Sequence, residues 1–335
     1  MGKLGFLVVL WVGCVRAPSA SVSTQSVTTP SAGLVFLEVQ DPMSDGRMKL
    51  AVFYPPALPA QGTTRVGPYE LSARTGLEVA PGRHPLIVLS HGHTGSNLGH
   101  HDLAEQLALA GYLVAAVEHP GDNWKDASGI GTDRVLFGRA YQVSRAIDAV
   151  LADGTLGAHV DGQRIGVAGF SAGGYTALTV LGAVPDFTRI HGYCARHPGD
   201  SEFCAFRERE TVLPAPPPLA DPRVKAAFVM APLGIFFAPE ALLAVRAPVF
   251  LAFADQDRVL LPDENAKAVA CSLPKLVGTD VVTGAGHYVL LAPCSMTRAN
   301  VAPELCRDPA GVDRVAVHAR LAREARTFFD EVLRR

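Results

Sequence analysis

The sequence has few charged residues and almost no net charge. Aspartate, glutamate, lysine and arginine make up 19% of its 335 residues, and 30 basic side chains stand against 32 acidic ones. Hydrophobic residues supply 48% of the chain, so it does not have the low hydrophobicity and high net charge of a disordered protein. It also lacks the basic excess of a protein that binds nucleic acid. The length suits one large domain or two ordinary ones, each with a substantial core.

The N-terminus carries an apolar run, Phe6–Val15, that is too short to span a membrane. About ten residues fall short of the roughly 18 that a membrane helix needs, whereas such a run after Lys3 is typical of a secretory signal peptide. We therefore expect residues 1–17 to be a signal peptide and residues 18–33, rich in Ser, Thr and Pro, to be a flexible tether. A buried N-terminal strand or helix is the alternative.

A second interpretation of the N-terminus involves Cys14. If Gly13 and Cys14 end a lipoprotein signal, Cys14 is acylated and anchors the protein to a membrane. Trp11 is a poor residue for such a signal. In either case we expect an exported protein, periplasmic or secreted, whose attachment to a membrane would depend on Cys14 alone.

The six cysteines are too few for a small protein built on disulfides, but they suit an oxidising compartment. Cys194 and Cys204 lie close in sequence and predict one disulfide. Cys271, Cys294 and Cys306 predict a second, with Cys294–Cys306 favoured and Cys271–Cys294 next, which leaves one thiol over. Zinc is the alternative near the first pair, with tolerable ligand spacing from His191, Cys194, His197 and Cys204.

From Leu34 onward, short apolar runs alternate with helical patterns, which is typical of an α/β protein with a doubly wound, mostly parallel sheet. We predict eight strands, which are Leu34–Gln40, Lys49–Tyr54, Leu86–Ser90, Leu113–Val117, Arg164–Ala168, Val224–Met230, Pro248–Phe253 and Asp280–Val282. The predicted helices include Arg139–Leu151, Thr176–Ala183 and Val312–Leu333. Another helix is expected to begin with a capping box made by Asp102 and Glu105.

One segment breaks this alternation. Residues 187–222 contain two cysteines, two histidines and the run Pro214-Ala-Pro-Pro-Pro218, without a strand or helix period. We interpret this segment as a loop or a cap-like insertion over one end of the sheet. The sequence therefore predicts a single domain, residues 34–335, interrupted by the insertion.

The strand Arg164–Ala168 runs into Gly169-Phe-Ser-Ala-Gly173, the pattern G-x-S-x-G between a strand and a helix. A sharp turn of this kind forces Ser171 into a strained backbone conformation, and small residues at its neighbours let the strand and helix approach closely. Ser171 would lie at the N-terminus of a helix, whose amides favour negative charge. We predict that Ser171 is a nucleophile and that Gly169 and Gly173 form its elbow. A glycine-rich packing turn is the alternative.

A serine hydroxyl needs a general base, and the base needs an acid that orients it. His287 has the best position of the eleven histidines, in a loop after the last predicted strand. His318 lies within the last helix, where we expect it to be solvated. The acid is expected after the preceding strand, where the spacing favours Asp257 and leaves Asp255 as the alternative. Glu240 would serve only if the acid followed an earlier strand.

An oxyanion hole needs two backbone amides aimed at the developing negative charge. We expect one from Ala172, directly after Ser171, and one from His93, in the loop after the strand Leu86–Ser90. A metal site is the alternative for this region, because several potential ligands crowd it, namely His91, His93, His100, His101 and Asp102. Their spacing matches no ligand pattern, so no metal is expected.

Three stretches resemble the α/β-hydrolase superfamily, namely Leu86-Ile-Val-Leu-Ser-His-Gly-His-Thr-Gly-Ser-Asn97, Ala110-Gly-Tyr-Leu-Val-Ala-Ala-Val-Glu-His-Pro-Gly-Asp122 and Gly169-Phe-Ser-Ala-Gly-Gly174. Within it they look most like predicted dienelactone hydrolases and lipases similar to platelet-activating-factor acetylhydrolases. Polyester hydrolases of the cutinase type are more distant. The resemblance spans most of the chain apart from the insertion. It implies an α/β-hydrolase fold and ester hydrolysis through an acyl-enzyme intermediate, with no cofactor.

Two departures limit what the resemblance implies. Dienelactone hydrolases use a cysteine nucleophile where this chain has Ser171, and the acetylhydrolases take their acid after an earlier strand, where residues 224–232 offer none. We therefore expect a serine hydrolase that acts on small or lipid-like carboxylic esters and does not bind nucleic acid. Amide or peptide hydrolysis by the same triad, and a non-catalytic binding protein with this fold, are the alternatives.

Overall fold

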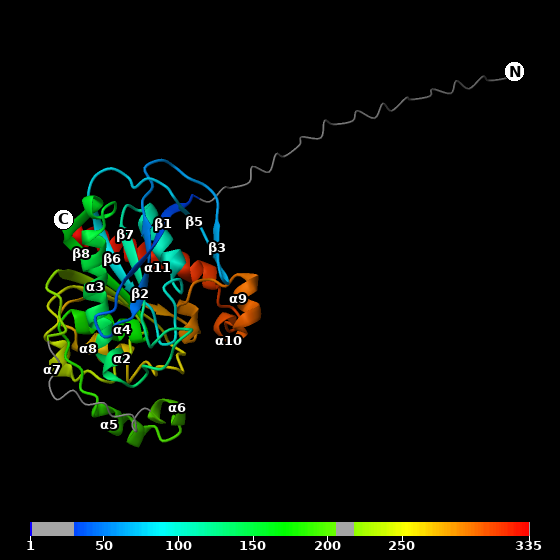
Figure 1. Ribbon diagram of the computed structural model, residues 1–335. Helices are drawn as coiled ribbons and strands as arrows, with labels where there is room; N and C mark the ends of the chain where they lie inside the picture. Colours follow the sequence, from blue (N-terminus) through cyan, green and yellow to red (C-terminus); the bar gives the residue numbers. More distant parts are fainter. Residues whose placement is uncertain (2–29, 206–217, 335) are drawn as a thin grey trace.

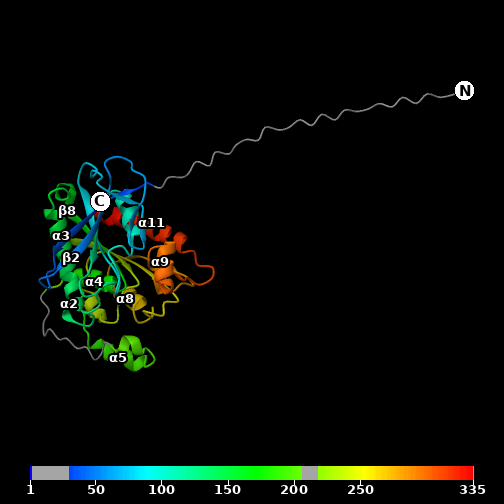
Figure 2. The same ribbon diagram turned by 45° about the vertical axis from the view of Figure 1, so that its right-hand side comes forward.

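The computed structural model describes residue 1, residues 30–205 and residues 218–334. Residues 2–17 of the predicted signal peptide, Cys14 among them, and residues 18–29 of the predicted tether lie outside this part of the chain. The described residues are built around a nine-stranded sheet with helices on both faces (Figures 1 and 2). Within the same residues, no helix combines the length and the apolar character needed to cross a membrane.

The sheet confirms all eight predicted strands and adds a ninth. In chain order the strands of the protein are β1 (Ala32–Gln40), β2 (Arg47–Tyr54), β3 (Thr64–Val66), β4 (Tyr69–Leu71), β5 (Ala73–Thr75), β6 (His84–Ser90), β7 (Leu113–Glu118), β8 (Val160–Phe170), β9 (Val224–Met230), β10 (Val249–Ala254) and β11 (Leu276–Val282). The order across the large sheet is β11-β10-β9-β8-β6-β7-β2-β1-β5. The ninth strand, β5, is only three residues long and pairs in parallel with β1, while β3 and β4 form a separate hairpin.

In the large sheet of the described residues, strands β6 to β11 run parallel to one another, and only β2 pairs antiparallel with its two neighbours. Their carboxyl ends therefore meet at one edge of the sheet, where ligands bind in open α/β folds. The loops after β6, β8, β10 and β11 carry the residues predicted for catalysis. The topology alone thus brings together residues that are far apart in sequence.

The helices of the described residues are α1 (His101–Leu109), α2 (Asp133–Leu136), α3 (Gly138–Ala152), α4 (Ala172–Val180), α5 (Arg189–Arg196), α6 (Ser201–Cys204), α7 (Pro239–Leu242), α8 (Ala266–Ser272), α9 (Met296–Val301), α10 (Pro303–Cys306) and α11 (Arg314–Leu333), with short 3-10 turns at Gly157–His159 (η1) and His287–Leu290 (η3). Helices α1 and α11 pack together on one face of the sheet, and α3 and α4 cover the other (Figure 2).

The apolar spacing of the last helix, α11, predicts a buried face made of Val315, Ala319, Ala322, Phe329 and Leu333, and the structure buries Phe329 and Leu333 of these. Phe328 and Phe329 are buried and their rings pack with Phe228 of β9, 6.4 Å from it between centroids. Val315 and Ala319, which the helical spacing places on the buried face, are exposed instead. The aromatic pair sets the rotation of the helix, because burying two large rings outweighs burying small aliphatic ones.

The predicted insertion holds two short helices, α5 and α6, which lie at the lower end of the molecule in Figure 1. A disulfide joins Cys194 of α5 to Cys204 of α6, so neither sulfur is available as a zinc ligand. A second disulfide joins Cys294 to Cys306, and Cys271 is an exposed free thiol. Both favoured pairings are therefore confirmed. Two disulfides are typical of a protein from an oxidising compartment.

Candidate active site

Ser171 occupies the sharp turn between β8 and α4. Its φ of 57° and ψ of −117° lie outside the regions that non-glycine residues normally adopt. The backbone is held there by a hydrogen bond from its N–H to the carbonyl of Met230, at 2.9 Å. A Cβ atom at Gly173 would overlap the carbonyl oxygen of Ser90, and one at Gly169 would overlap Gly173 itself. Both glycines are therefore required by the close approach of strand and helix.

His287 and Asp257 form a buried pair at the ends of η3 and β10. The distance from His287 Nδ1 to Asp257 Oδ2 is 2.6 Å, and both side chains are almost fully buried. The other carboxylate oxygen of Asp257 accepts the backbone N–H groups of Val259 and Leu260, at 2.9 and 2.8 Å. These two hydrogen bonds fix the carboxylate in one orientation, with Oδ2 aimed at the imidazole.

Asp255, the alternative acid, has a different role in the structure. Its Oδ1 accepts the backbone N–H of Gly284 at 2.7 Å, which ties the turn after β10 to the loop that leads to His287. Glu240 lies exposed in the short helix α7. Of the three candidate acids, only Asp257 is hydrogen-bonded to His287.

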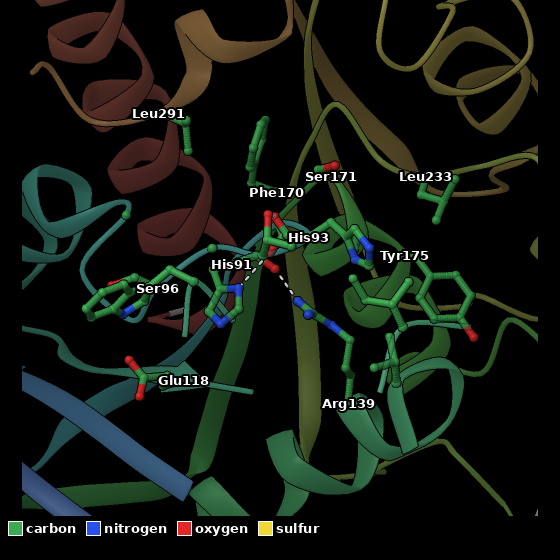
Figure 3. A pocket seen from close by; sticks show the side chains of 18 of the residues that line it. His91, His93, Ser96, Glu118, Arg139, Phe170, Ser171, Tyr175, Leu233 and Leu291 are labelled. Atoms are coloured by element: carbon green, nitrogen blue, oxygen red, sulfur yellow. Dashed lines mark hydrogen bonds between the residues drawn. The ribbon is translucent and has the colours of Figure 1, made fainter. Parts of the chain in front are cut away.

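Ser171 and His287 line one cavity of about 1910 Å³, together with the predicted oxyanion residues Ala172 and His93. The ring of His287 packs against Phe170, with 4.7 Å between centroids. Most of the lining is apolar and comes from every side of the cavity, as shown by Tyr69, Phe137, Phe187, Leu233, Phe236 and Leu260. In the view of Figure 3, Phe170 and Ser171 lie above His91 and His93.

A buried ion pair beneath this loop was not anticipated from the sequence. Arg139 of α3 is 1% exposed, and its Nη1 donates to Asp122 Oδ2 at 2.7 Å. Asp122 Oδ1 accepts the N–H of Thr94 at 2.9 Å and lies 2.8 Å from His93 Nδ1. Arg139 also donates to the carbonyl oxygen of His91 (Figure 3). Burial raises the pKa of Asp122. The charge of Arg139 and the contacts with His93 and Thr94 lower it by more, so that the pKa lies well below its usual value.

This ion pair holds the loop from which the oxyanion amide of His93 is expected. The signal that could have revealed it is the position of Arg139 and Gln142 on the same face of α3 as the buried Val143 and Ala146. A charged or amide side chain on the apolar stripe of a helix is buried, and a buried polar group needs a hydrogen-bond or ion-pair partner.

His91, one of the histidines that suggested a metal, and its neighbour His119 are neutral structural groups. Burial, with a further contribution from Arg139, lowers the pKa of His91 to about 3, and burial also lowers the pKa of His119 well below its usual value. His119 is hydrogen-bonded through Nε2 to Ser90 Oγ at 2.9 Å and through Nδ1 to Gln142 Oε1 at 2.7 Å. In the described part of the chain, no group of three or more His, Cys, Asp and Glu side chains could hold a metal ion.

The expectation that His318 is solvated is wrong, and so is the predicted capping box. His318 is buried, its Nδ1 lies 2.5 Å from Asp102 Oδ2, and its Nε2 lies 2.9 Å from the carbonyl of Val289. Burial lowers the pKa of His318, but the charge and hydrogen bond of Asp102 raise it above its usual value. Glu105 pairs with His101 instead of capping α1. The α1–α11 contact therefore rests partly on an ion pair, which also supports η3.

Comparisons with known proteins agree with this architecture. A sequence model of the family described as platelet-activating factor acetylhydrolase, isoform II, matches residues 63–135. A search of curated proteins finds no match. A ferulic acid esterase from Streptomyces cinnamoneus is 24% identical with a TM-score of 0.63, covering 96% of this chain and 93% of its own. A dienelactone hydrolase from Anabaena variabilis is 16% identical with a TM-score of 0.50, covering 90% of this chain and 99% of its own.

At these identities the likeness to the two solved structures is one of fold. It extends over nearly the whole length of all three chains. The strand order, with its single antiparallel strand β2, and the strained serine between β8 and α4 belong to the same architecture. The chain has the α/β-hydrolase fold.

Proposed function

We propose that the protein is a serine hydrolase that cleaves carboxylic esters through an acyl-enzyme intermediate. The observation that carries this proposal is the hydrogen bond that Asp257 accepts from His287, which lines the same cavity as Ser171. The strained turn at Ser171 adds support, because strain of this kind persists only where the surrounding structure enforces it.

The proposed mechanism assigns one task to each residue. His287 takes the proton of the Ser171 hydroxyl as Oγ attacks the ester carbonyl, and Asp257 accepts the hydrogen bond from Nδ1–H and stabilises the imidazolium. The backbone amides of Ala172 and His93 stabilise the oxyanion. His287 then protonates the leaving alcohol, and a water molecule activated by the same histidine hydrolyses the acyl-serine. The steps need no cofactor.

The cavity supports a substrate with an apolar body. Its lining is mainly aromatic and aliphatic, and such surfaces bind the carbon skeleton of a ligand while a few polar groups orient it. The names of the similar proteins describe esterases and lactone hydrolases, which favours esters over amides as the substrate class. We also propose that the protein is exported, with residues 1–17 as its signal peptide, and the two disulfides support this.

The test is covalent labelling followed by turnover. A fluorophosphonate probe should label the protein, and labelling should be lost in Ser171→Ala but retained in Ser96→Ala, which changes another serine of the same cavity. Hydrolysis of 4-nitrophenyl esters of increasing chain length should then be measured beside the matching 4-nitroanilides. Turnover of the anilides at a comparable rate would favour the amidase alternative, and labelling that survives Ser171→Ala would overturn the nucleophile. Failure to label or to hydrolyse either series would favour a non-catalytic binding protein.

A further inference from the structure

Arg298 is a buried cation that faces the cavity without an acidic partner. The residue is only 8% exposed and lines the same cavity as Ser171. Across residues 30–205 and 218–334, no carboxylate forms an ion pair with it, and its Nη1 has no hydrogen-bond partner. Its guanidinium lies over the ring of Tyr69, 4.8 Å from the centroid. An aromatic face stabilises a guanidinium but accepts none of its in-plane hydrogen bonds.

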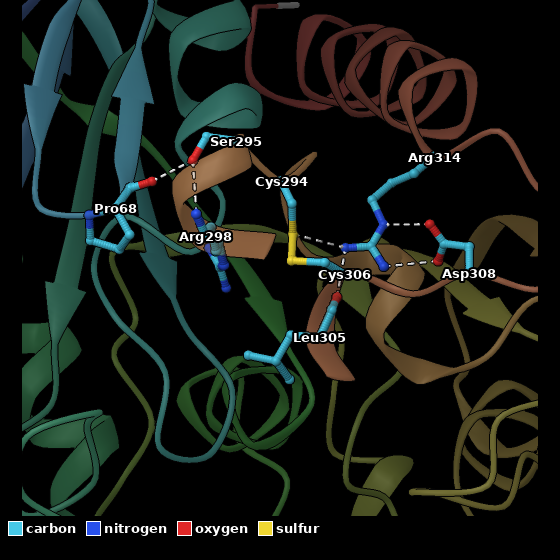
Figure 4. Close-up of a disulfide and its surroundings, with 8 residues drawn as sticks. All are labelled: Pro68, Cys294, Ser295, Arg298, Leu305, Cys306, Asp308 and Arg314. Carbon is cyan, nitrogen blue, oxygen red and sulfur yellow. Dashed lines mark hydrogen bonds and ion pairs between the residues drawn. A yellow bond between two sulfur atoms is a disulfide. The ribbon is translucent and has the colours of Figure 1, made fainter. Parts of the chain in front are cut away.

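The structure holds Arg298 in a rigid frame (Figure 4). The Cys294–Cys306 disulfide closes the segment that contains α9 and α10. Ser295 caps α9 by accepting the backbone N–H of Arg298 at 3.1 Å, and its hydroxyl donates to the carbonyl of Pro68 at 2.6 Å. A covalent link and two hydrogen bonds thus fix the backbone at Arg298 next to the β3–β4 turn, where its guanidinium lies over Tyr69.

Other unsatisfied polar atoms lie in the same region. Of the five buried side-chain atoms without a partner among the described residues, four belong to His100, Asp102 and Arg298. His100 lines the cavity, and its ring lies 5.1 Å from that of Phe170, which in turn packs on His287. Burial lowers the pKa of His100 to about 3. The charge of Asp102 opposes this effect, and the charges of His318 and Arg298 add to it. His100 is therefore a neutral donor and acceptor.

A buried guanidinium without a counter-charge is costly, and native proteins pair such groups or leave them for a ligand. Asp102 does not supply the missing charge, because its Oδ2 pairs with His318 and no ion pair joins either of its oxygens to Arg298. An anionic group that entered the cavity would find one charged donor in Arg298 and one neutral hydrogen-bonding partner in His100. Guanidinium groups bind carboxylates and phosphates with the same planar donors.

We propose that Arg298, together with His100 of the same cavity, forms a subsite for an anionic group of the ester substrate, remote from the bond that is cleaved. The substrate class is then an ester whose acyl or alcohol portion ends in a carboxylate or a phosphate, with the apolar part of the cavity holding the chain between the two functional groups. This inference rests on the proposed ester hydrolysis for its role in specificity. Binding of the anion depends only on Arg298 and the cavity.

The first experiment compares charged and neutral forms of the same ester. Mono-4-nitrophenyl esters of linear dicarboxylic acids, from glutarate to sebacate, are assayed beside their methyl-capped counterparts, which carry no charge. At one or more chain lengths, the charged ester should have the lower KM in the native protein. In Arg298→Met this advantage should disappear, because the KM of the charged esters should rise by about 10- to 100-fold and that of the capped esters should change far less.

Arg65→Met is the matched control. Arg65 is an exposed arginine on the adjacent strand β3, it bonds Thr297 of α9 at 3.0 Å, and it does not line the cavity. Its loss should leave the preference for charged esters intact. Arg298→Lys keeps the charge and should restore part of the preference, which a loss of packing alone would not allow. Equal effects of Arg298→Met on charged and capped esters, or a native protein that prefers the capped ester at every length, would overturn the subsite.

A second measurement separates this inference from the proposed function. Binding of monomethyl adipate and of hexyl phosphate to Ser171→Ala protein is followed by calorimetry, so no turnover is needed. Binding that is lost in the Ser171→Ala, Arg298→Met double variant supports the subsite even if no ester is hydrolysed, and the tighter of the two ligands tells carboxylate from phosphate. Absence of binding by either ligand, in a protein that hydrolyses neutral esters, would refute the subsite and leave the hydrolase intact.

Discussion

Replacing Asp257 by Asn tests the assignment of the acid with very little change of shape. In the structure Oδ1 of Asp257 accepts two backbone N–H groups and Oδ2 faces His287 Nδ1 at 2.6 Å. An asparagine can keep its carbonyl oxygen on the two amides, because these are donors, and must then turn its NH₂ group toward His287. That group donates a hydrogen bond, so Nδ1 has to lose its proton and Nε2 must carry one. A histidine protonated at Nε2 cannot accept the proton of Ser171.

The expected loss is large because the wrong tautomer removes the general base. In a serine protease triad the same exchange of Asp for Asn lowers kcat by about 10⁴-fold, which corresponds to ~5 kcal/mol of transition-state stabilisation. Asp255→Asn offers the matched control in the same turn. Its carboxylate accepts one N–H, from Gly284, and an asparagine oxygen can accept the same hydrogen bond. We expect a loss of less than about tenfold for Asp255→Asn.

The assay is hydrolysis of a short 4-nitrophenyl ester by the purified variants, with kcat and KM determined separately at several pH values. Asp257→Asn should lower kcat with little change in KM, and its melting temperature should stay close to that of the native protein. Labelling by a fluorophosphonate should slow in parallel. Equal losses in the Asp255 and Asp257 variants, or a larger loss at Asp255, would refute the assignment of Asp257.

Three further changes test the support of the site. Gly173→Ala should prevent native folding, because its Cβ would overlap the carbonyl of Ser90; soluble variant protein with native circular dichroism and activity would contradict the close approach. Replacing both cysteines of Cys294–Cys306 by Ser should lower the free energy of unfolding by about 2–4 kcal/mol in urea titrations, and an unchanged midpoint would argue against a structural role. His318→Gln should destabilise most between pH 3.8 and 6.5, because the pKa of His318 is raised from 6.5 and that of Asp102 is lowered from 3.8. The difference should shrink as pH rises through the raised pKa of His318, and a difference that stays constant over the whole alkaline range in which the native protein remains folded would contradict the ion pair.

The large sheet was predictable because each of its long strands is a continuous apolar run between turn signals. The run Leu86–Leu89, buried on both faces, is the plainest example. Strand β5 was missed because three residues, Ala73–Thr75, carry no period. The buried face of α11 was predictable only in part. Phe329 and Leu333 are buried as expected, whereas Val315 and Ala319 are exposed, because the rings of Phe328 and Phe329 both pack against the sheet.

The candidate site was predictable where the chain itself enforces the geometry. Ser171 lies in a motif whose glycines have a steric reason, and His287 follows the last strand, so the parallel topology brings the two to one edge. The hydrogen-bond networks behind them were not predictable in the same way. Arg139 and Asp122 come from different elements, and which polar side chains meet depends on helix rotation and loop path, which no local pattern encodes.

Two buried ion pairs hold the site from opposite faces of the sheet. Arg139 and Asp122 fix the loop that carries His93, on the side of α3. The pair of His318 and Asp102 joins α11 to α1, and Nε2 of His318 is hydrogen-bonded to a carbonyl of η3, the turn that begins at His287. A pair of this kind adds little net stability compared with apolar side chains, but removing one partner leaves a buried charge and is strongly destabilising. Each pair contacts a loop that carries a proposed catalytic group. We therefore expect the two pairs to act mainly by holding these loops in position. A conservative change such as Arg139→Lys should therefore lower kcat more than it lowers the melting temperature, because a lysine keeps the charge but cannot contact Asp122 and the His91 carbonyl with the same fixed planar geometry.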